Sequence, residues 1–505
     1  MAYRLPRLTV ASNRLPVRVT RDSEEEWSVR RSSGGLVSAL RPVLAERGGT
    51  WLGWSGVCDV APARLDGLLE EAGEGFDLKP VTLTSDDVDG YYLGYSNRML
   101  WPFLHGLPHF SEPRPGDWPA YRRVNAVFAQ ALSSCAQGPV WVHDYHLMLV
   151  AQELRSEGFR HPVGYFLHTP FPEPDVIRTL PQVNTILCGL MSFDSIGFQT
   201  RRDRGNFIEA VQELAPEAPG QQGTTGPCAP LKARARAFPI SIDTPSWSRR
   251  ASSPAVERRA AEIRRTLGSD LVLGVDRLDY SKGIPHKLRG YARALERYPS
   301  LRGRVVLRQL AIPTRQQIPA YAELRQRVEE LAREVNHRFG TSEWTPVELI
   351  VGTWDTDELT AQYRAADVLL VTSLRDGMNL VAKEFCASSV ADGGVLVLSS
   401  FAGSASQLGS GALMVDPRDA DGLARAIHRG VTMDRGERHW RRAILRSAVR
   451  DADVRAWAAN ALDALDARGE TGTTRRPMPG TRSSPPVRRK RRRHSPVSRR
   501  RATPG

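Results

Sequence analysis

Arg277 and Lys282 are two cations five residues apart in one polar turn, and together they could grip a phosphate or diphosphate. An apolar run, residues 271–275, precedes the turn, Gly283 ends it, and a helix-like segment, residues 287–295, follows. A polar turn between a buried strand and a helix is where an open α/β sheet presents a ligand site. Two solvated charges in a surface loop are the alternative interpretation, and a bare pair of cations favours it.

A second polar turn of the same kind follows the apolar run 368–372. It places Asp376 and Gly377 at the mouth of a predicted helix that carries Glu384. Backbone amides at a helix start can hold phosphate oxygens, and a carboxylate a few residues later can accept ribose hydroxyls. The two turns therefore predict one nucleotide site.

The N-terminal segment has a weaker signal for phosphate binding. Residues 8–11 read as a buried strand, residues 12–16 as a polar turn, and Gly34-Gly35 as the start of an amphipathic helix that ends near Leu44. This arrangement resembles half of a nucleotide-binding unit but lacks the G-x-G-x-x-G fingerprint. The glycine pair could equally be an ordinary turn.

Aromatic residues gather in stretches that Gly and Pro mark as loops, among them Trp51, Trp54, Tyr92 and Trp101. Aromatic rings in loops suit the faces of sugars, while core packing is the alternative that periodicity does not decide. Residues 86–90, Asp-Asp-Val-Asp-Gly, mimic the start of an aspartate-nucleophile phosphatase motif. No apolar strand precedes them, so we predict a polar turn there.

Histidines and one aspartate follow two further predicted strands, residues 140–142 and 163–167. His143, Asp144 and His146 come after the first strand, and His168 comes after the second. No H-E-x-x-H or comparable pairing is present, so a metal site is not expected.

These residues need a scaffold of alternating strands and helices. Such alternation predicts doubly wound parallel sheets, in two Rossmann-like halves that face one cleft. We expect an N-terminal domain over residues 1–240, a second domain over 241–450, a C-terminal helix over 451–469 that returns to the first domain, and a disordered polybasic tail over 470–505. The expected strands of the second domain are residues 271–275, 304–310, 347–351, 368–372 and 395–398.

Composition narrows the function classes. The net charge of the 505 residues is +14, but 12 basic and no acidic residues lie between 471 and 505, which leaves +2 on residues 1–470. The tail could contact polyanions nonspecifically, and a nucleic-acid-associated or regulatory protein is one alternative function. Five scattered cysteines favour a reducing cytosol over a disulfide framework. The sequence shows neither a secretory h-region nor a membrane span, so we expect a cytoplasmic protein.

Taken in order, the motifs resemble those of the trehalose-6-phosphate synthases, and the resemblance covers residues 6–465. The matching stretches are Ser12–Arg14, Gly34–Leu36, Gly53–Gly56, Ser96–Pro102, His143–His146, His168–Pro172, Asp276–Gly283 and Arg375–Glu384. The resemblance implies the two-domain, B-type glycosyltransferase fold. It also implies transfer of glucose from a nucleotide-diphosphate donor to glucose 6-phosphate, with retention at the anomeric carbon, without a metal and without a cofactor.

The resemblance also assigns site residues. Those implied for the donor are Gly35, Arg277, Lys282, Trp354, Asp376, Met378, Asn379, Leu380, Val381 and Glu384. Those implied for the acceptor are Arg14, Trp54, Tyr92, Trp101, Asp144 and Arg315. Arg277, Lys282, Asp144 and His168 are the implied catalytic group, with the two cations stabilising the leaving diphosphate and Asp144 positioning the acceptor.

Two departures from the family pattern bear on specificity. Residues 311–315 differ from the usual run before the phosphate-binding arginine, and Trp354 stands where the family often has a different aromatic residue. A glucosylglycerol-phosphate synthase or a cyclitol pseudo-glycosyltransferase of the same fold is therefore the alternative activity. No phosphatase domain is expected after the transferase. The expected partners are small-molecule substrates and other copies of the chain, in a homo-oligomer.

Overall fold

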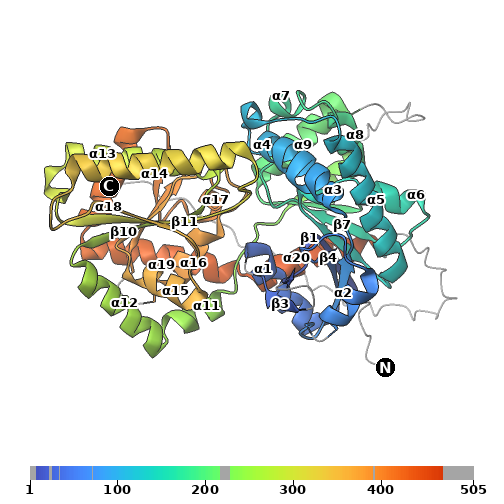
Figure 1. Cartoon of the computed structure of the whole chain (residues 1–505), viewed down its shortest axis with the longest axis horizontal. Helices are drawn as coiled ribbons and strands as arrows, with labels where there is room; N and C mark the ends of the chain where they lie inside the picture. Colours follow the sequence, from blue (N-terminus) through green and yellow to red (C-terminus); the bar gives the residue numbers. More distant parts are fainter. Residues whose placement is uncertain are drawn as a thin grey trace, which may run out of the picture.

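The computed structural model describes residues 7–21, 26–32, 34–70, 72–215, 228–390 and 393–469, and two parallel sheets dominate it (Figure 1). The basic tail lies outside the described residues. Within the described ranges, no helix combines the length and the apolar character that crossing a bilayer requires.

The N-terminal sheet has seven parallel strands. In spatial order they are β5 (Asp77–Val81), β4 (Gly49–Trp54), β1 (Leu8–Arg14), β6 (Val140–His143), β7 (Val163–Phe166), β8 (Ser195–Phe198) and β9 (Ala235–Ala237). Helices cover both faces, so the central strands are buried on both sides and can be apolar along their length. A separate antiparallel pair, β2 (Val17–Arg21) and β3 (Trp27–Arg31), follows β1.

The C-terminal sheet has six parallel strands. In spatial order they are β12 (Val347–Val351), β11 (Val305–Ile312), β10 (Asp270–Arg277), β13 (Val368–Val371), β14 (Val395–Ser399) and β15 (Leu413–Val415). The expectation of two doubly wound parallel sheets is confirmed, and the strands expected in the second half all occur, with ends displaced by at most two residues.

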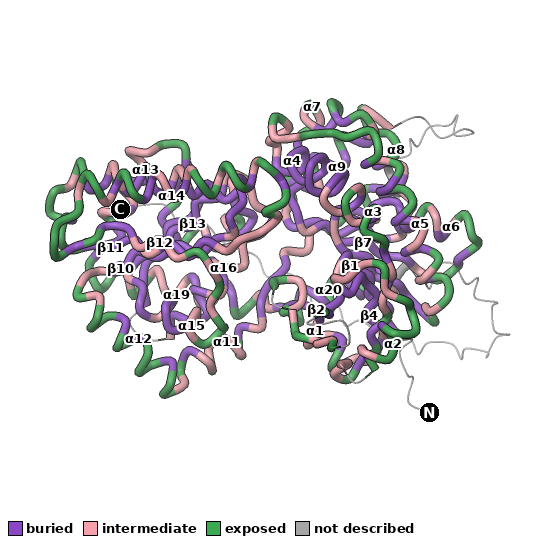
Figure 2. Tube along the Cα trace, viewed as in Figure 1, coloured by how far each residue is buried: buried purple, intermediate pink, exposed green. Residues whose placement is uncertain are grey.

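Helical segments surround the two sheets, and the burial colouring of Figure 2 places the buried residues on the strands and on the inward sides of these helices. Around the first sheet they are α1 (Gly35–Arg47), α2 (Pro62–Leu69), α3 (Ser85–Asp87), η1 (Val88–Leu100), α4 (Trp101–Leu104), η2 (Pro108–Phe110), α5 (Asp117–Cys135), η3 (Tyr145–Leu147), α6 (Val150–Ser156), α7 (Pro174–Ile177), α8 (Val183–Met191), α9 (Arg201–Leu214) and α10 (Cys228–Arg234). After β9 they are α11 (Thr244–Ala251), α12 (Pro254–Leu267), η4 (Tyr280–Lys282), α13 (Ile284–Arg297), η5 (Pro299–Leu301), α14 (Pro319–Phe339), α15 (Thr356–Ala365), α16 (Leu380–Ser388), α17 (Ala405–Leu408), α18 (Ala420–Thr432), α19 (Arg435–Asp451) and α20 (Val454–Gly469).

Each sheet reverses its direction of growth once, and the reversals define where ligands bind. The chain runs from β1 to β4 and β5 and then returns to β6 on the other side of β1. It runs likewise from β10 to β11 and β12 and then to β13 on the other side of β10. Open α/β sheets bind ligands beyond the carboxyl ends of the strands at such switch points. The ends of β1, β6, β10 and β13 and the turns that follow them carry many of the predicted site residues, among them Arg14, Asp144, Arg277 and Asp376.

The last helix, α20, packs against the first sheet although it follows the second in sequence (Figure 1). The Trp457 ring lies 5.1 Å from the Trp141 ring, measured between centroids. Leu465 occupies the space that the absent side chain of Gly164 leaves on β7. The chain thus crosses between the sheets twice, and the crossings touch where the Val454 amide donates to the Ile242 carbonyl at 3.0 Å.

The predicted polar turn at residues 86–90 and the predicted loops around Tyr92 and Trp101 are wrong, because this stretch is helical from Ser85 to Leu104. The predicted loop around Trp51 and Trp54 is wrong as well, because both residues lie on β4. Thr84 and Asp87 form a capping box that starts α3. Gly94 departs from helical geometry inside η1, and Pro102 lies in the first turn of α4, where a helix tolerates proline. Glycine and proline here mark breaks within a helical stretch.

Candidate active site

The turn after β10 has the strand–turn–helix form that its sequence predicts. Arg277 is the last residue of β10, η4 follows, and Gly283 at φ 66° leads into α13. A Cβ at residue 283 would lie 2.3 Å from the Thr372 carbonyl oxygen, so only glycine fits between the two turns. The Lys282 amine donates to the Asp376 carboxylate at 2.5 Å, which ties this turn to the one after β13.

The turn after β13 holds the start of α16 opposite the start of α1. Asn379, at φ 72°, caps α16 through the Ala382 amide and donates to Asp376 at 3.1 Å. A Cβ added at Gly35 would lie 2.6 Å from the Leu380 side chain, so the two helix N-termini approach closely. The partial positive charges of both ends then fall on the same region, as a diphosphate requires.

Glu384 lies one turn into α16 and is half-buried. Tyr363 donates its hydroxyl to the Glu384 carboxylate at 2.9 Å. Burial nevertheless raises the pKa of Glu384 to about 7. The other predicted donor residues of this region are Met378, which is buried, and Val381 and Trp354, which are half-buried beside the core of the second domain.

Arg14 lies among aromatic rings at the end of β1. Its guanidinium carbon is 4.0 Å from the centroid of the Trp54 ring and 5.4 Å from that of Tyr92. The Tyr92 ring in turn stacks on His146, with centroids 5.9 Å apart. Burial lowers the pKa of Arg14, and the phenol of Tyr92 raises it less. A desolvated guanidinium beside rings is a strong site for an anion.

Arg315 reaches the same region from the loop after β11, with its backbone at φ 47°. Its guanidinium donates to the hydroxyls of Tyr321 at 2.6 Å and Tyr145 at 3.0 Å, and to Asp279 at 3.3 Å. Its guanidinium carbon lies over the Trp101 ring, 3.9 Å from the ring centroid.

Arg277 lies 5.3 Å from the same Trp101 centroid, so one ring supports a cation from each predicted subsite. Burial favours a higher pKa for the Tyr92 phenol, but the charges of Arg315, Arg14 and Arg277 outweigh it and lower that pKa. The three arginines therefore converge on one phenol.

Asp144 and His168 lie at the ends of β6 and β7. Asp144 has φ 75°, and its carboxylate accepts the His168 amide at 3.1 Å. Burial raises the pKa of Asp144 to about 6, although backbone amides and Arg315 oppose the rise. His168 contacts His143 through ring nitrogens 3.0 Å apart, and burial lowers the pKa of His168 to about 3. The neutral imidazole of His168 and the carboxylate of Asp144 are both suited to hydrogen-bond the hydroxyls of a sugar.

Metal binding finds no candidate among the described residues, where no three His, Cys, Asp or Glu side chains gather as ligands. The three histidines differ in their exposure: His143 and His146 are buried, and His168 is half-buried at the interdomain surface.

Several residues join the site that the sequence did not assign to it. Asp279, Tyr145 and Tyr321 all contact Arg315, and His146 supports Tyr92. Asp279 and Tyr145 lie inside motifs that the sequence already singles out, and this location was the sequence signal that could have assigned them to the site. Trp51, in contrast, is a core residue that packs near Phe76, with ring centroids 6.1 Å apart.

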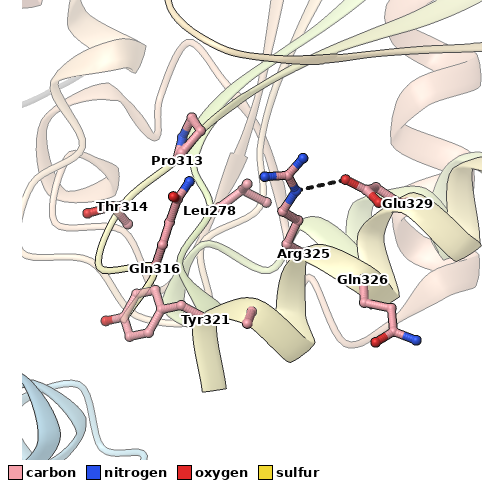
Figure 3. Close-up of a pocket in the computed structure, with 9 residues that line it drawn as sticks. Leu278, Pro313, Thr314, Gln316, Tyr321, Arg325, Gln326 and Glu329 are labelled. Atoms are coloured by element: carbon pink, nitrogen blue, oxygen red, sulfur yellow. Dashed lines mark hydrogen bonds and ion pairs between the residues drawn. The ribbon is translucent and has the colours of Figure 1, made fainter. Parts of the chain in front are cut away.

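A cavity of about 310 Å³ lies beside the loop that carries Arg315 (Figure 3). Its lining comes from that loop, from α14 and from the turn after β10, and consists of Leu278, Pro313, Thr314, Gln316, Tyr321, Ala322, Arg325, Gln326 and Glu329. Arg325 and Glu329 pair with each other across its wall at 2.8 Å. None of the predicted substrate residues lines it, so we assign it no substrate.

Comparison with known proteins agrees with this arrangement. Residues 6–467 match the sequence profile of glycosyltransferase family 20. Trehalose-6-phosphate synthase of Mycolicibacterium smegmatis is 39% identical over 92% of this chain and 93% of its own.

Two solved structures are similar over almost their whole length. A structure from E. coli, bound with UDP-2-fluoro glucose, has a TM-score of 0.79 and 33% identity over 91% of this chain and 98% of its own. A UDP-forming α,α-trehalose-phosphate synthase from Burkholderia xenovorans, in complex with glucose-6-phosphate, has a TM-score of 0.80 and 34% identity over 91% of this chain and 100% of its own.

Two facing Rossmann-like sheets, with arginine or lysine side chains at the strand ends of both switch points, define a glycosyltransferase of the B type. The chain belongs to glycosyltransferase family 20, the family of the trehalose-6-phosphate synthases, and the resemblance seen in its motifs is confirmed.

Proposed function

We propose that this chain transfers glucose from UDP-glucose to glucose 6-phosphate and forms α,α-trehalose 6-phosphate. The observation that carries the proposal is that Arg277 and Arg315 lie on one Trp101 ring, at 5.3 and 3.9 Å from its centroid. Two arginines so close together suit two anionic substrates whose reacting ends meet between them. The names of the relatives support UDP as the nucleotide, since the Burkholderia enzyme is UDP-forming and the E. coli structure binds a UDP-glucose analogue.

On the donor side, Arg277 and Lys282 hold the diphosphate and offset the charge that develops as it leaves. In the structure, the Lys282 amine donates to Asp376. When it binds the diphosphate, the amine must either donate to both groups or give up the bond to Asp376. The remaining donor roles are backbone approach by Gly35, amides from Met378, Asn379, Leu380 and Val381, ribose binding by Glu384, contact with the base by Trp354, and contact with the transferred glucose by Asp376 and His168.

On the acceptor side, Arg14, Tyr92 and Arg315 bind the 6-phosphate, and Trp54 and Trp101 shape the pocket. Asp144 holds sugar hydroxyls and positions the acceptor. Reaction on the donor's front face lets the leaving phosphate take the acceptor proton, so the scheme needs no nucleophile from the enzyme.

A substrate panel tests the proposal. Purified protein is incubated with UDP-, GDP- or ADP-glucose, each with glucose 6-phosphate or glycerol 3-phosphate, and nucleotide release is measured. We expect release of UDP that depends on glucose 6-phosphate, with an α,α-linked product by NMR. Absence of nucleotide release with glucose 6-phosphate from every donor would refute the proposal, and preference for glycerol 3-phosphate would favour the glucosylglycerol-phosphate alternative.

The domain boundaries, the homo-oligomer, the cytoplasmic location and the polyanion contacts of the basic tail stay predictions from the sequence. Size-exclusion chromatography with light scattering tests the oligomer. Removal of residues 471–505 tests whether the tail is separate from catalysis.

A further inference from the structure

Asp279 is a buried carboxylate between the two groups of substrate-binding cations. Its side chain has no exposed surface, and it belongs to the turn that joins Arg277 to Lys282. A buried carboxylate is costly unless hydrogen bonds and opposite charges surround it.

One oxygen of Asp279 fixes the orientation of the carboxylate. Oδ1 accepts the Ser281 amide at 3.0 Å and the Ser281 hydroxyl at 2.8 Å. It also accepts the indole N–H of Trp101, from the N-terminal half of the chain, at 3.4 Å. These three donors come from both halves of the chain, so the carboxylate is held where the halves meet.

The other oxygen faces both arginines. Oδ2 accepts Nη1 of Arg315 at 3.3 Å and lies 4.0 Å from Nη2 of Arg277. Burial favours a higher pKa for Asp279, but the charges of Arg315 and Arg277 outweigh it and lower the pKa to about 2. Asp279 is therefore an anion throughout the working pH range.

Asp279 is one of the groups that hold Arg315 in position, beside the hydroxyls of Tyr321 and Tyr145. The backbone of Arg315 is left-handed at φ 47°, and its Nε is buried without a hydrogen-bond partner. Its guanidinium shares the Trp101 ring with Arg277, and the repulsion between the two like charges is offset by a carboxylate that contacts both.

We propose that Asp279 is a positioning residue that holds Arg277 and Arg315 in one arrangement, so that binding in the donor site and binding in the acceptor site favour each other. The inference rests on the proposed function for the identity of the two ligands. A phosphate group that engages one arginine steadies the shared arrangement through Asp279, so that ordering the other arginine costs less when the second phosphate binds. The coupling is reciprocal, because linkage requires each ligand to change the affinity of the other by the same factor.

The test is Asp279→Asn, which keeps the size and an acceptor oxygen for Ser281 but removes the charge. Calorimetry measures the affinity for UDP with and without glucose 6-phosphate, and steady-state assays measure kcat and KM. In the natural protein we expect glucose 6-phosphate to tighten UDP binding by about fivefold or more. In the variant we expect this enhancement to vanish, glucose 6-phosphate to bind about tenfold more weakly, and kcat to fall.

The direction in which Asp279→Asn changes the affinity for glucose 6-phosphate distinguishes a positioning role from a role as a counter-charge. Removal of a negative charge beside two arginines strengthens phosphate binding if Asp279 acts only as a counter-charge. Tighter binding of glucose 6-phosphate with unchanged kcat, retained enhancement in the variant, or absence of enhancement in the natural protein would each overturn the proposal. Because calorimetry needs no turnover, a failed transferase assay alone would count against the proposed function and not against the coupling.

Two further variants complete the design. Asp270→Asn is the matched control, because Asp270 begins the same strand and pairs with Arg304 at 2.8 Å at the strand's distant end, and we expect no change in coupling. Ser281→Ala removes one donor from Oδ1 and covers the case in which Asp279→Asn does not fold. We expect Ser281→Ala to weaken the enhancement partly, and an unaltered enhancement with unaltered kcat would overturn the proposal.

Discussion

Arg277 and Lys282 have different surroundings although one turn carries both. The side chain of Arg277 is 41% exposed and lies against Trp101, whereas Lys282 is buried and donates to Asp376. In the proposed binding mode, Arg277 meets the diphosphate with its exposed side, whereas Lys282 meets it from its ion pair with Asp376. Burial favours a higher pKa for Asp376, but the Lys282 charge outweighs it and lowers that pKa, so the pair is ionic at neutral pH.

Replacement of either cation by alanine should depress turnover. Charge on the leaving diphosphate grows in the transition state, so each cation contributes more there than in the bound substrate. We expect Arg277→Ala and Lys282→Ala to lower kcat by about 100-fold or more, with a smaller rise in the donor KM. Arg304→Ala, which removes an exposed cation at the far end of β10, is the control. Unchanged kcat in both site variants would contradict the assigned role.

Glu384 should make donor binding depend on pH. Its pKa of about 7 means that the ionised fraction rises from about a tenth at pH 6 to about nine-tenths at pH 8. The ionised carboxylate accepts hydroxyl donors best, so we expect UDP affinity, measured by calorimetry, to increase over this range. The same raised pKa makes the folded protein lose stability as pH rises from about 4.5 to 7, because the folded state then holds the extra proton.

Glu384→Gln is the control for that pH effect. The amide keeps its shape and one acceptor oxygen but does not titrate. We expect its UDP affinity to be lower at pH 8 and nearly constant between pH 6 and 8. A pH profile in the variant that equals the natural one would assign the effect to another group.

At the scale of elements, the helical stretch from α3 to α4 carries much of the proposed acceptor site. It presents Tyr92 and Trp101, and it begins at the capping box of Thr84 and Asp87. The same box, Thr200 with Asp203, begins α9, which carries none of the predicted substrate residues. The two capping boxes therefore form a matched pair for mutation, because only the one at Thr84 starts a stretch that carries predicted substrate residues.

Thr84→Ala should cost stability and acceptor affinity together. Loss of an N-cap costs about 1 kcal/mol, which lowers the thermal midpoint of a domain this size by about 2–4 °C. Because the displaced helix start leads into the segment of Tyr92 and Trp101, we expect a higher KM for glucose 6-phosphate. Thr200→Ala should lower the midpoint similarly and leave that KM unchanged. Equal KM changes in both variants would show that the effect is general destabilisation.

Prediction from sequence succeeded where one physical signal dominated. Strands such as β13 are buried, short and bounded by polar residues, so an apolar run predicted the limits of β13 to within one residue. Prediction failed for the stretch from Ser85 to Leu104. Gly94 and Pro102 suggest a loop there, and the capping box that starts the helix consists of two polar residues, which a turn would also contain. Asp279 lies in a motif that the sequence singles out, but its contact with Arg315 could not be predicted. Arg315 is 36 residues away in sequence, and only the fold brings the two side chains together.

At the scale of the molecule, the two halves meet at the site itself and at the two crossing segments. Buried Lys383 on α16 donates to the Ile240 carbonyl in the first crossing at 2.6 Å, and Thr244 donates to the Val449 carbonyl beside the second at 2.9 Å. These bonds fix the crossings to the second domain, near the helix that bears Glu384. Closure of the halves around two substrates would then bend the chain at these few residues, as in other two-domain enzymes.

Gly377 tests how closely the halves must meet. A Cβ at this position would lie 2.0 Å from the His168 carbonyl oxygen and 3.0 Å from its carbonyl carbon, and both atoms are backbone of the opposite half. No rotamer change relieves that clash, so Gly377→Ala has to move the turn of Asp376 away from His168. A misplacement of about 1 Å between reacting groups costs about 100-fold in rate, and we expect a fall in kcat of that order.

The matched control is Gly205→Ala on α9, where an added Cβ meets nothing within 4 Å, so kcat should hold. Small-angle scattering with UDP and glucose 6-phosphate gives the second readout. We expect both ligands together to compact the natural protein and to compact Gly377→Ala less. If Gly377→Ala kept the natural kcat and the natural compaction, the close contact between the turn of Asp376 and His168 would not be needed for catalysis, and the two halves would act with more space between them than the structure shows.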